Sequence, residues 1–310
     1  MTFYVLFALL ALCSGQTISP TTSPSPAPFC PYNVTKTVTP CNFRDHSNFT
    51  AAVGTIVRVF ISGGGGGGAY YEGGGRGASF LASFVSDGGD YSISLIGRGG
   101  GGGAGGGAGG GATAIVRNDA LIAVAAGGGG SGYFAGGNGG PPDGSGAVGQ
   151  CDYCGICPKG GSQGAIGIGS MGVGSLPRNG TAFVNSTYGG NGASLPGPNI
   201  FGGNGWGKGG STVSNPTYSG GAGGAGLYGG GAGSSYGGGC GYAAGGAGGS
   251  SYINSSLGVV YGLLAFVGGG AARTPGSPGF AYLYICPLVT SAPLDLLSCA
   301  LLAHFALLTQ

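Results

Sequence analysis

The sequence predicts an all-β protein, a β-sandwich that carries an inserted bundle of polyglycine-II helices. Short apolar, β-branched runs recur along the chain, and none has the spacing of an amphipathic helix. Glycine tracts fill the sequence between these runs, with 81 glycines in 310 residues. Only 6% of the residues are charged and 42% are hydrophobic, a composition that argues against ordinary disorder.

The apolar runs predict the strands of the sandwich. They cover residues 54–62, 78–86, 90–97, 112–117, 120–127, 250–254, 258–268 and 279–286. Asp87-Gly88-Gly89 separates the second and third runs and predicts a hairpin there. Asn118-Asp119 separates the fourth and fifth runs and predicts another tight turn. Because the strands come from both ends of the domain, the sheets should fix the ends of the glycine tracts that lie between the strands in sequence.

The glycine tract Gly97–Gly111 shows why a bundle is expected. Glycine loses much conformational entropy on folding, but tract ends fixed in a packed sandwich offset part of that cost. Polyglycine can form a left-handed helix with about three residues per turn, whose outward backbone groups bond to neighbouring helices. Only glycine lets backbones approach so closely, so Ala104 and Ala108 should face outward or lie at bundle edges. The alternative is a set of flexible glycine-rich loops.

Both ends of the chain carry apolar segments that indicate export. Residues 1–15 have the pattern of a signal peptide, and the Ser/Thr/Pro-rich residues 16–29 that of a stalk. Residues 30–287 are the glycine-rich domain, and residues 288–310 are expected to be a glycosylphosphatidylinositol anchor signal. The attachment candidates are Thr290, Ser291 and Ala292. A weak membrane helix and a packed terminal helix are the alternatives for this tail. The protein is thus expected outside the cell, at its surface, with a membrane contact through the C-terminal anchor.

The cysteines predict disulfide bonds. Setting aside Cys13 of the signal peptide and Cys299 of the tail leaves seven of the nine cysteines. These seven are Cys30, Cys41, Cys151, Cys154, Cys157, Cys240 and Cys286. In an oxidising compartment they should pair, and the odd number leaves one thiol free or bonded outside the chain. The stretch "CDYCGIC" also has metal-ligand spacing, but a disulfide loop is favoured because His46 lies far away in sequence. A cystine from Cys286 to Cys30 or Cys41 would join the two ends of the domain.

Five N-glycosylation sequons predict a glycoprotein, because such sites mark exposed loops of exported proteins. They lie at Asn33, Asn48, Asn179, Asn185 and Asn254. Asn215 is excluded because Pro216 follows it.

The composition argues against catalysis and nucleic-acid binding. Ten Lys and Arg stand against eight Asp and Glu, with no basic cluster, so no nucleic-acid partner is expected. Catalysis needs groups with a tunable pKa, and outside the tail the chain has His46, Glu72 and aspartates at turn-like positions. No enzyme activity, cofactor or metal is therefore expected.

Aromatic side chains interrupt the glycine tracts and are candidates for binding, because tyrosine and tryptophan are enriched at interfaces. The binding candidates are Tyr70, Tyr71, Trp206, Tyr228 and Tyr236. Tyr133, Phe134, Tyr218 and Tyr242 interrupt the tracts in the same way. The alternative is that these rings cap tract ends and pack on the sandwich.

Several stretches together resemble the glycine-rich extracellular domain of the anaplastic lymphoma kinase and leukocyte tyrosine kinase receptors. They read "GGGRGASFLASFV", "YSISLIGRGGGGGAGGG", "ATAIVRNDALIAVAAGGGG", "GGGCGYAAGGAGGSSYIN" and "GFAYLYI", and the resemblance spans Gly54 to Cys286. It implies a tumour-necrosis-factor-like sandwich with inserted polyglycine helices, and the binding of small protein ligands. The chain departs from the receptors because it has no kinase signature, and their ligand contacts do not map onto it.

The sequence therefore predicts a secreted or surface-anchored glycoprotein that acts as a structural, adhesive or protein-ligand-binding module. Its expected partner is an extracellular protein or a surface glycan. A cell-wall structural protein and an ice-binding protein are the alternatives. The first would be insoluble with cross-linked tyrosines, and the second would cause thermal hysteresis.

Overall fold

The strands in the described part of the chain pair in antiparallel sheets, as the all-β prediction requires. The computed structural model describes residues 41–43, 47–94, 100–101, 105–118, 120–142, 144–152, 155, 157–162, 164–169, 199–200, 212–213, 219–234, 242–257 and 259–286. Within these ranges the helical content is one 3-10 turn, Ser255–Leu257. The expected signal peptide, stalk and anchor signal lie outside the described residues.

The strands form two five-stranded sheets and one separate pair. The first sheet has the order β1 (Cys41–Phe43), β12 (Phe280–Cys286), β3 (Ile56–Ser62), β4 (Gly77–Val85) and β11 (Val260–Val267). The second has the order β10 (Tyr252–Ile253), β7 (Ala120–Ala125), β6 (Thr113–Arg117), β5 (Gly89–Ser94) and β2 (Ser47–Ala51). The pair is β8 (Asn199–Ile200) with β9 (Thr212–Val213). Each predicted run contains a strand, whereas β1, β2, β8 and β9 were not predicted.

The two predicted turns have different outcomes. Asn118-Asp119 joins β6 to β7, which pair with each other, so this hairpin is confirmed. The hairpin expected at Asp87-Gly88-Gly89 is wrong, because β4 belongs to the first sheet and β5 to the second. Gly88 and Gly89 have φ angles of 89° and 112°, a region that suits glycine. The glycines therefore serve a sharp passage between sheets rather than a two-stranded ladder.

One apolar core joins the two sheets. Alternate residues of β3, namely Val57, Val59 and Ile61, are fully buried in it. Phe80 of β4 and Ile115 of β6 belong to the same cluster. Because both sheets contribute to one cluster, the period-two pattern of the apolar runs determines which strand faces are buried.

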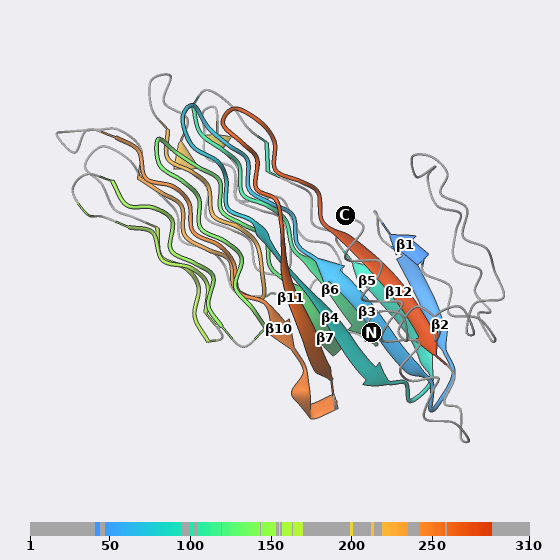
Figure 1. Cartoon of the computed structure of the whole chain (residues 1–310). Helices are drawn as coiled ribbons and strands as arrows, with labels where there is room; N and C mark the ends of the chain where they lie inside the picture. The colour runs from blue at the N-terminus through green and yellow to red at the C-terminus, as the bar shows by residue number, and fades with distance from the viewer. Residues whose placement is uncertain are drawn as a thin grey trace, which may run out of the picture.

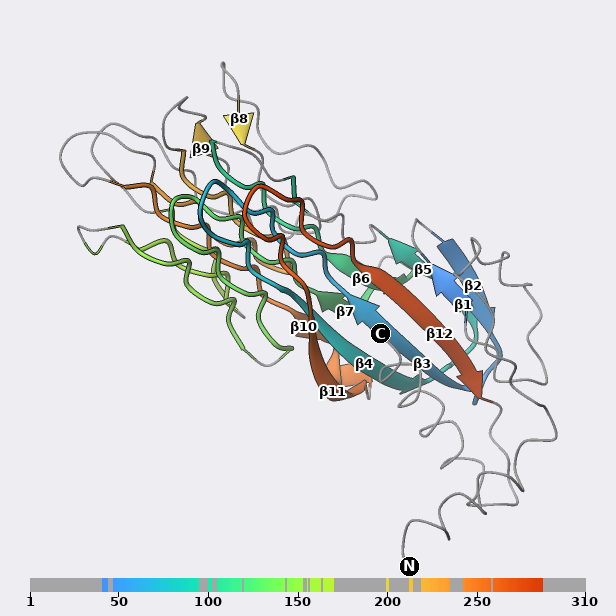
Figure 2. The same cartoon turned by 45° about the horizontal axis from the view of Figure 1, so that its top comes forward.

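The glycine tracts all leave the same end of the sheets and run side by side, as Figures 1 and 2 show. The chain enters a tract at the end of β3 and returns from it into β4, and the tracts beside β6, β7, β11 and β12 follow the same course. Buried hydroxyl groups line the junction. Ser79 Oγ donates to Ser62 Oγ at 2.7 Å, and Thr113 Oγ1 donates to the Ser62 carbonyl at 2.7 Å.

Backbone hydrogen bonds between tracts repeat every three residues. In the tract 63–68 the N–H donors and carbonyl acceptors are Gly63 to Ala78, Gly64 to Gly111, Gly65 to Ser277, Gly66 to Gly75, Gly67 to Ala108 and Gly68 to Thr274. Every third donor thus returns to the same neighbouring tract. A strand would alternate between two sides, so the backbone here has a threefold arrangement of neighbours.

The same three-residue spacing appears in other tracts and in their alanines. Gly127 and Gly130 both donate to the tract 222–225, and Gly128 and Ser131 both donate to the tract 64–67. The buried alanines Ala222 and Ala225 lie three residues apart, as do Ala244 and Ala247. These four alanines are fully buried, so the tracts accommodate alanine at some interior positions. Ala108 is half-buried, and Ala104 lies outside the described residues.

Many tract glycines have no room for a side chain. A Cβ at Gly66 would lie 2.0 Å from the carbonyl oxygen of Gly129, and one at Gly130 would lie 2.0 Å from that of Gly107. A Cβ at Gly101 would meet nothing within 4 Å. Close backbone approach thus explains why Gly66 and Gly130 are glycine, but it does not explain Gly101.

Candidate functional site

An aromatic cluster lies where the glycine tracts reverse direction, at the end remote from the sheets. We call Tyr70, Tyr71, Tyr133, Phe134 and Tyr242 the tract-end aromatic cluster. Tyr70 and Tyr71 follow the tract that begins after β3, whereas Tyr133 and Phe134 follow the tract that begins after β7. Two binding candidates from the sequence are thus brought together with three further rings.

The rings contact one another in a continuous series. The centroids of Tyr70 and Tyr71 are 4.4 Å apart, and those of Tyr71 and Tyr133 are 4.7 Å apart. Tyr133 also lies 5.3 Å from Phe134 and 4.0 Å from Tyr242. Tilted and edge-on contacts at these distances are favourable between aromatic side chains.

Hydrogen bonds of the Ser131 side chain hold the two turns of the cluster together. The Ser131 hydroxyl donates to the Glu72 carbonyl at 2.8 Å and accepts from the Ala69 N–H at 2.5 Å. Tyr133 is fixed in turn because its N–H donates to the Ala243 carbonyl at 3.0 Å. The rings are therefore carried by turns that are bonded to each other across the bundle.

The cluster presents polar and apolar surface to solvent at the same place. Tyr70 is 42% exposed and Tyr71 is 52% exposed. The guanidinium carbon of Arg273 lies 3.8 Å from the centroid of the Tyr70 ring, a cation–π contact. Arg273 was not among the predicted site residues. An isolated positive charge beside a tract, in a chain with so few charges, is the signal that could have identified it.

The other predicted aromatic residues lie elsewhere. Tyr228 is half-buried near the sheets, where its N–H donates to Ser250 Oγ at 3.1 Å just before β10. The tract that precedes it runs toward the sheets, since Ala225 packs against residues of β6 and β7. Trp206 and Tyr236 lie outside the described residues.

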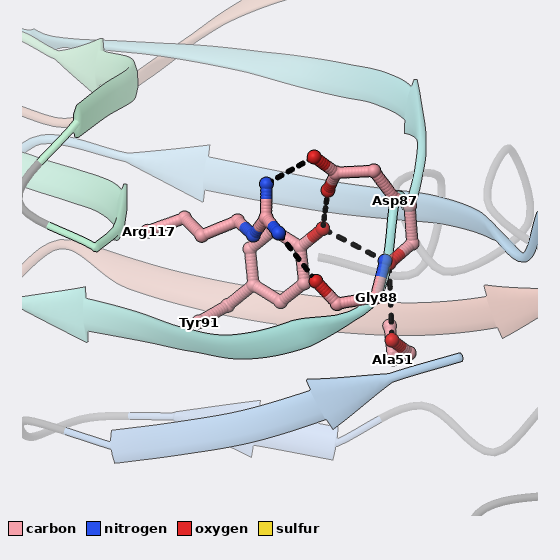
Figure 3. A network of polar contacts seen from close by, with 6 residues as sticks. Ala51, Asp87, Gly88, Tyr91 and Arg117 are labelled. Carbon is pink, nitrogen blue, oxygen red and sulfur yellow. Dashed lines mark hydrogen bonds and ion pairs between the residues drawn. The ribbon is translucent and has the colours of Figure 1, made fainter. Parts of the chain in front are cut away.

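A polar network at the opposite end of the sheets is a second site of interest (Figure 3). Arg117 forms an ion pair with Asp87, and its Nη2 donates to the Gly88 carbonyl at 2.6 Å. The Tyr91 hydroxyl lies 2.9 Å from Ser86 Oγ, which donates to the Ala51 carbonyl at 3.0 Å. The network links β2, β5 and β6 to the passage between the sheets.

The electrostatics of this network are those of a structural site. Desolvation raises the pKa of Asp87. The hydrogen bond from Arg117 and its positive charge outweigh this effect, so the pKa lies below its usual 3.8. Burial raises the pKa of the Tyr91 hydroxyl above its usual 10.0, although the Ser86 hydrogen bond lowers it in part. An ionised aspartate paired with arginine and a protonated tyrosine hold the turn, and neither is prepared to move a proton near neutral pH.

The cysteines and sequons are partly placed. Cys151 and Cys157 form a disulfide, as the loop prediction proposed. Cys41 lies opposite Leu283 and Cys286 opposite Ile56, while Cys30, Cys154 and Cys240 lie outside the described residues. Asn48 is exposed and Asn254 is half-buried, with its Nδ2 donating to the Leu121 carbonyl at 3.2 Å. Asn33, Asn179 and Asn185 lie outside the described residues.

Among the described residues, no three His, Cys, Asp or Glu side chains gather as a metal site would require. No helix in the described ranges has the length and apolar character to cross a bilayer. No protein-family model matches the chain, and comparison with curated proteins finds no similar sequence.

Proposed function

We propose that this protein is a secreted or surface-anchored recognition module that binds an extracellular protein through the tract-end aromatic cluster. The observation that carries the proposal is the group of five contacting rings, two of them well exposed, beside the Arg273 guanidinium. Tyrosine and arginine are the residues most often found at the energetic centres of protein interfaces.

The proposal includes a finer description of the fold. The two sheets with one core are a tumour-necrosis-factor-like sandwich, and each glycine tract is a polyglycine-II helix. The three-residue repeat of hydrogen bonds supports this, since such a helix has about three residues per turn. The absence of room for a Cβ at Gly66 and Gly130 also supports it. The resemblance to the receptor glycine-rich domains, which rests on the sequence stretches quoted above, implies the same fold.

Binding, rather than catalysis, accounts best for where the exposed side chains lie. The cluster consists of aromatic rings beside one guanidinium, and the turn that carries Tyr70 and Tyr71 adds a single exposed carboxylate, that of Glu72. A bundle of bonded tracts can instead hold the turns in fixed positions, which lowers the entropy lost on binding. The glycine bundle is thus a support that carries a binding surface away from the sheets.

The experiment compares the binding of labelled domain to cells and extracellular matrix before and after removal of the exposed rings. Tyr70→Ser with Tyr71→Ser should reduce binding by at least about tenfold, because central aromatic residues carry much of an interface's affinity. Thermal unfolding should change little, since both side chains are exposed.

Val53 and Val85 provide the matched control. They are 76% and 59% exposed at the other end of the sheets, so Val53→Ser with Val85→Ser removes comparable apolar surface elsewhere. This variant should bind as the unaltered protein does. Equal loss in both variants, or no loss in either, would contradict the proposal. Thermal hysteresis in place of binding would instead support the ice-binding alternative.

A further inference from the structure

Arg273 has a backbone conformation that arginine rarely adopts. It is the third residue of a turn in which the Thr274 N–H donates to the Ala271 carbonyl at 3.0 Å, and its φ angle is 60°. Turns with a positive φ at this position usually carry glycine or asparagine, because a Cβ crowds the backbone there. This chain has 81 glycines, yet an arginine stands where glycine would be free of strain. Strain of this kind clusters at functional sites, which indicates that the guanidinium, and not the turn, is the reason for this residue.

The bundle holds the Arg273 turn beside the exposed rings. The Arg273 N–H donates to the Ala69 carbonyl at 2.7 Å, and the Gly68 N–H donates to the Thr274 carbonyl at 2.8 Å. Both bonds join the turn to the tract that leads directly into Tyr70. The guanidinium carbon consequently lies 3.8 Å from the centroid of the Tyr70 ring. The charge is therefore held in one place at the tract end, so little side-chain entropy is lost when it binds a partner.

The guanidinium is fixed in position, but its hydrogen-bonding capacity is unused. Arginine carries several N–H donors, and in the part of the chain that the structure describes none of those on the Arg273 side chain donates to an acceptor. Glu72 is exposed on the neighbouring turn, whose Ala69 N–H donates to the Glu72 carbonyl, and its carboxylate forms no ion pair with Arg273. A planar guanidinium with free donors is suited to a carboxylate supplied by another molecule.

The geometry points to a carboxylate-binding position at Arg273, so that the partner of the tract-end aromatic cluster is a protein segment rich in Asp and Glu. This inference rests on the function proposed above and names the chemistry of its partner. A carboxylate of the segment accepts two parallel hydrogen bonds from the guanidinium, while neighbouring side chains pack on Tyr70 and Tyr71. The two ring planes are inclined by 62°, and Arg273 lies over the Tyr70 ring, so they do not form one flat face on which a sugar could stack. A peptide, whose side chains contact each ring separately, fits this arrangement better than a glycan.

The test measures, by fluorescence anisotropy, how tightly the secreted full chain binds a labelled peptide that alternates Asp and Gly. A counterpart with Asn in place of every Asp is the neutral comparison, and sialyllactose is a glycan that also carries a carboxylate. The acidic peptide should bind at least about tenfold more tightly than the neutral one, and added salt should weaken it. Arg273→Gln should remove this preference, and Arg273→Lys should keep only part of it because an ammonium lacks the planar fork. Glu72→Gln should increase the preference, because a like charge beside the site is removed.

Arg273→Gly separates recognition from structure. Glycine accepts the positive φ without strain, so this variant should lose the preference as Arg273→Gln does, while its melting temperature changes by no more than about 3 °C. Arg76→Gln is the control, because Arg76 is exposed beside the first residue of β4, at the sheet end of its tract, and should not affect binding.

Three results of these measurements would each overturn the inference. They are equal binding of the acidic and neutral peptides, tighter binding of sialyllactose than of the acidic peptide, and a lower melting temperature with unchanged binding in Arg273→Gly. Binding to cells and matrix distinguishes this inference from the proposed function. Binding that persists in Arg273→Gln but is lost in Tyr70→Ser with Tyr71→Ser would overturn the role of Arg273 alone, whereas binding that persists in both would overturn the proposed function as well.

Discussion

The two halves of this molecule, the sheets and the glycine tracts, hold their backbones together in opposite ways. The sheets pair through strands and exclude water with side chains such as Val57, Phe80 and Ile115 from one shared core. The tracts have almost no side chains, and each backbone instead bonds to several neighbouring tracts in turn. Stability therefore depends on buried volume in the sheets and on close backbone approach in the tracts.

This difference predicts which substitutions each half tolerates. In a sheet core, removing atoms leaves a cavity and costs stability. In the tracts, adding a single carbon is the damaging change, because a Cβ would overlap a neighbouring carbonyl. Alanine is accepted only on particular faces, such as the one that carries Ala222 and Ala225.

The largest effect is expected for Gly66→Ala. The added Cβ would lie 2.0 Å from the Gly129 oxygen, and the shift would disturb the bonds from Gly66 to Gly75 and from Gly270 to Gly66. Each buried backbone group left unpaired costs about 1–3 kcal/mol, so the loss would consume much of a domain stability of roughly 5–15 kcal/mol. Thermal unfolding and amide hydrogen exchange measure it.

Gly101→Ala is the matched control for that change. A Cβ at Gly101 meets nothing within 4 Å, and the residue is exposed. We expect a change within about 0.5 kcal/mol, as for ordinary surface substitutions. Equal melting temperatures for the two variants would show that the tracts are flexible loops and would remove the basis of the comparison.

A somewhat smaller loss of stability is expected when a large side chain is removed from the core between the sheets. Phe80 is fully buried, and Phe80→Ala should cost about 3–5 kcal/mol in the free energy of unfolding. Because the tracts are fixed at the ends of the strands, their amide protons should lose protection together with those of the sheets. Tract amides that stay protected while the sheets exchange would show that the two halves fold independently.

The sequence predicted the sheets better than the tracts, for a physical reason. Period-two apolar runs determine which faces of β3 and β4 are buried, and all the predicted runs contain strands. Short strands such as β1 and β2 were missed because their few residues carry little apolar pattern. The turn at Gly88 was misread because local residues specify a sharp change of direction but not the sheet that receives the next strand.

Glycine tracts carry no side-chain pattern from which their neighbours could be read. The sequence could predict that tracts bond laterally, but not that the turn at Tyr70 lies against the turn at Tyr133. Tyr71 was therefore predicted as a binding residue, but its contact with Tyr133 was not predicted. Arg273 was not identified as a site residue. The sequence also could not identify the tract alanines that are buried, such as Ala222 and Ala225, because room for a methyl group depends on which tract lies opposite.

A smaller, pH-dependent effect is expected on the outer face of the first sheet. Burial raises the pKa of Tyr284 above 10.0 in the folded protein, so the unfolded chain loses this proton first as the pH rises. The contribution to stability is full below about pH 10 and is lost as the pH rises through the folded-state pKa. Tyr284→Phe should lessen this loss of stability at alkaline pH. Urea denaturation at pH 8 and pH 11 measures the difference.

The smallest effect is expected at the passage between the sheets. Because Arg117 lowers the pKa of Asp87 below 3.8, the unfolded chain binds a proton there before the folded protein does. The contribution is therefore complete above about pH 4 and disappears as the pH falls through the lower, folded-state pKa. Asp87 is exposed, so solvent screening keeps the effect small, and added salt should reduce it further. Asp87→Asn and Arg117→Gln should each remove the same part of the acid dependence, and the double variant should remove no more. Denaturation curves from pH 2 to pH 6 test this, and additive effects in the double variant would show that the ion pair is not the cause.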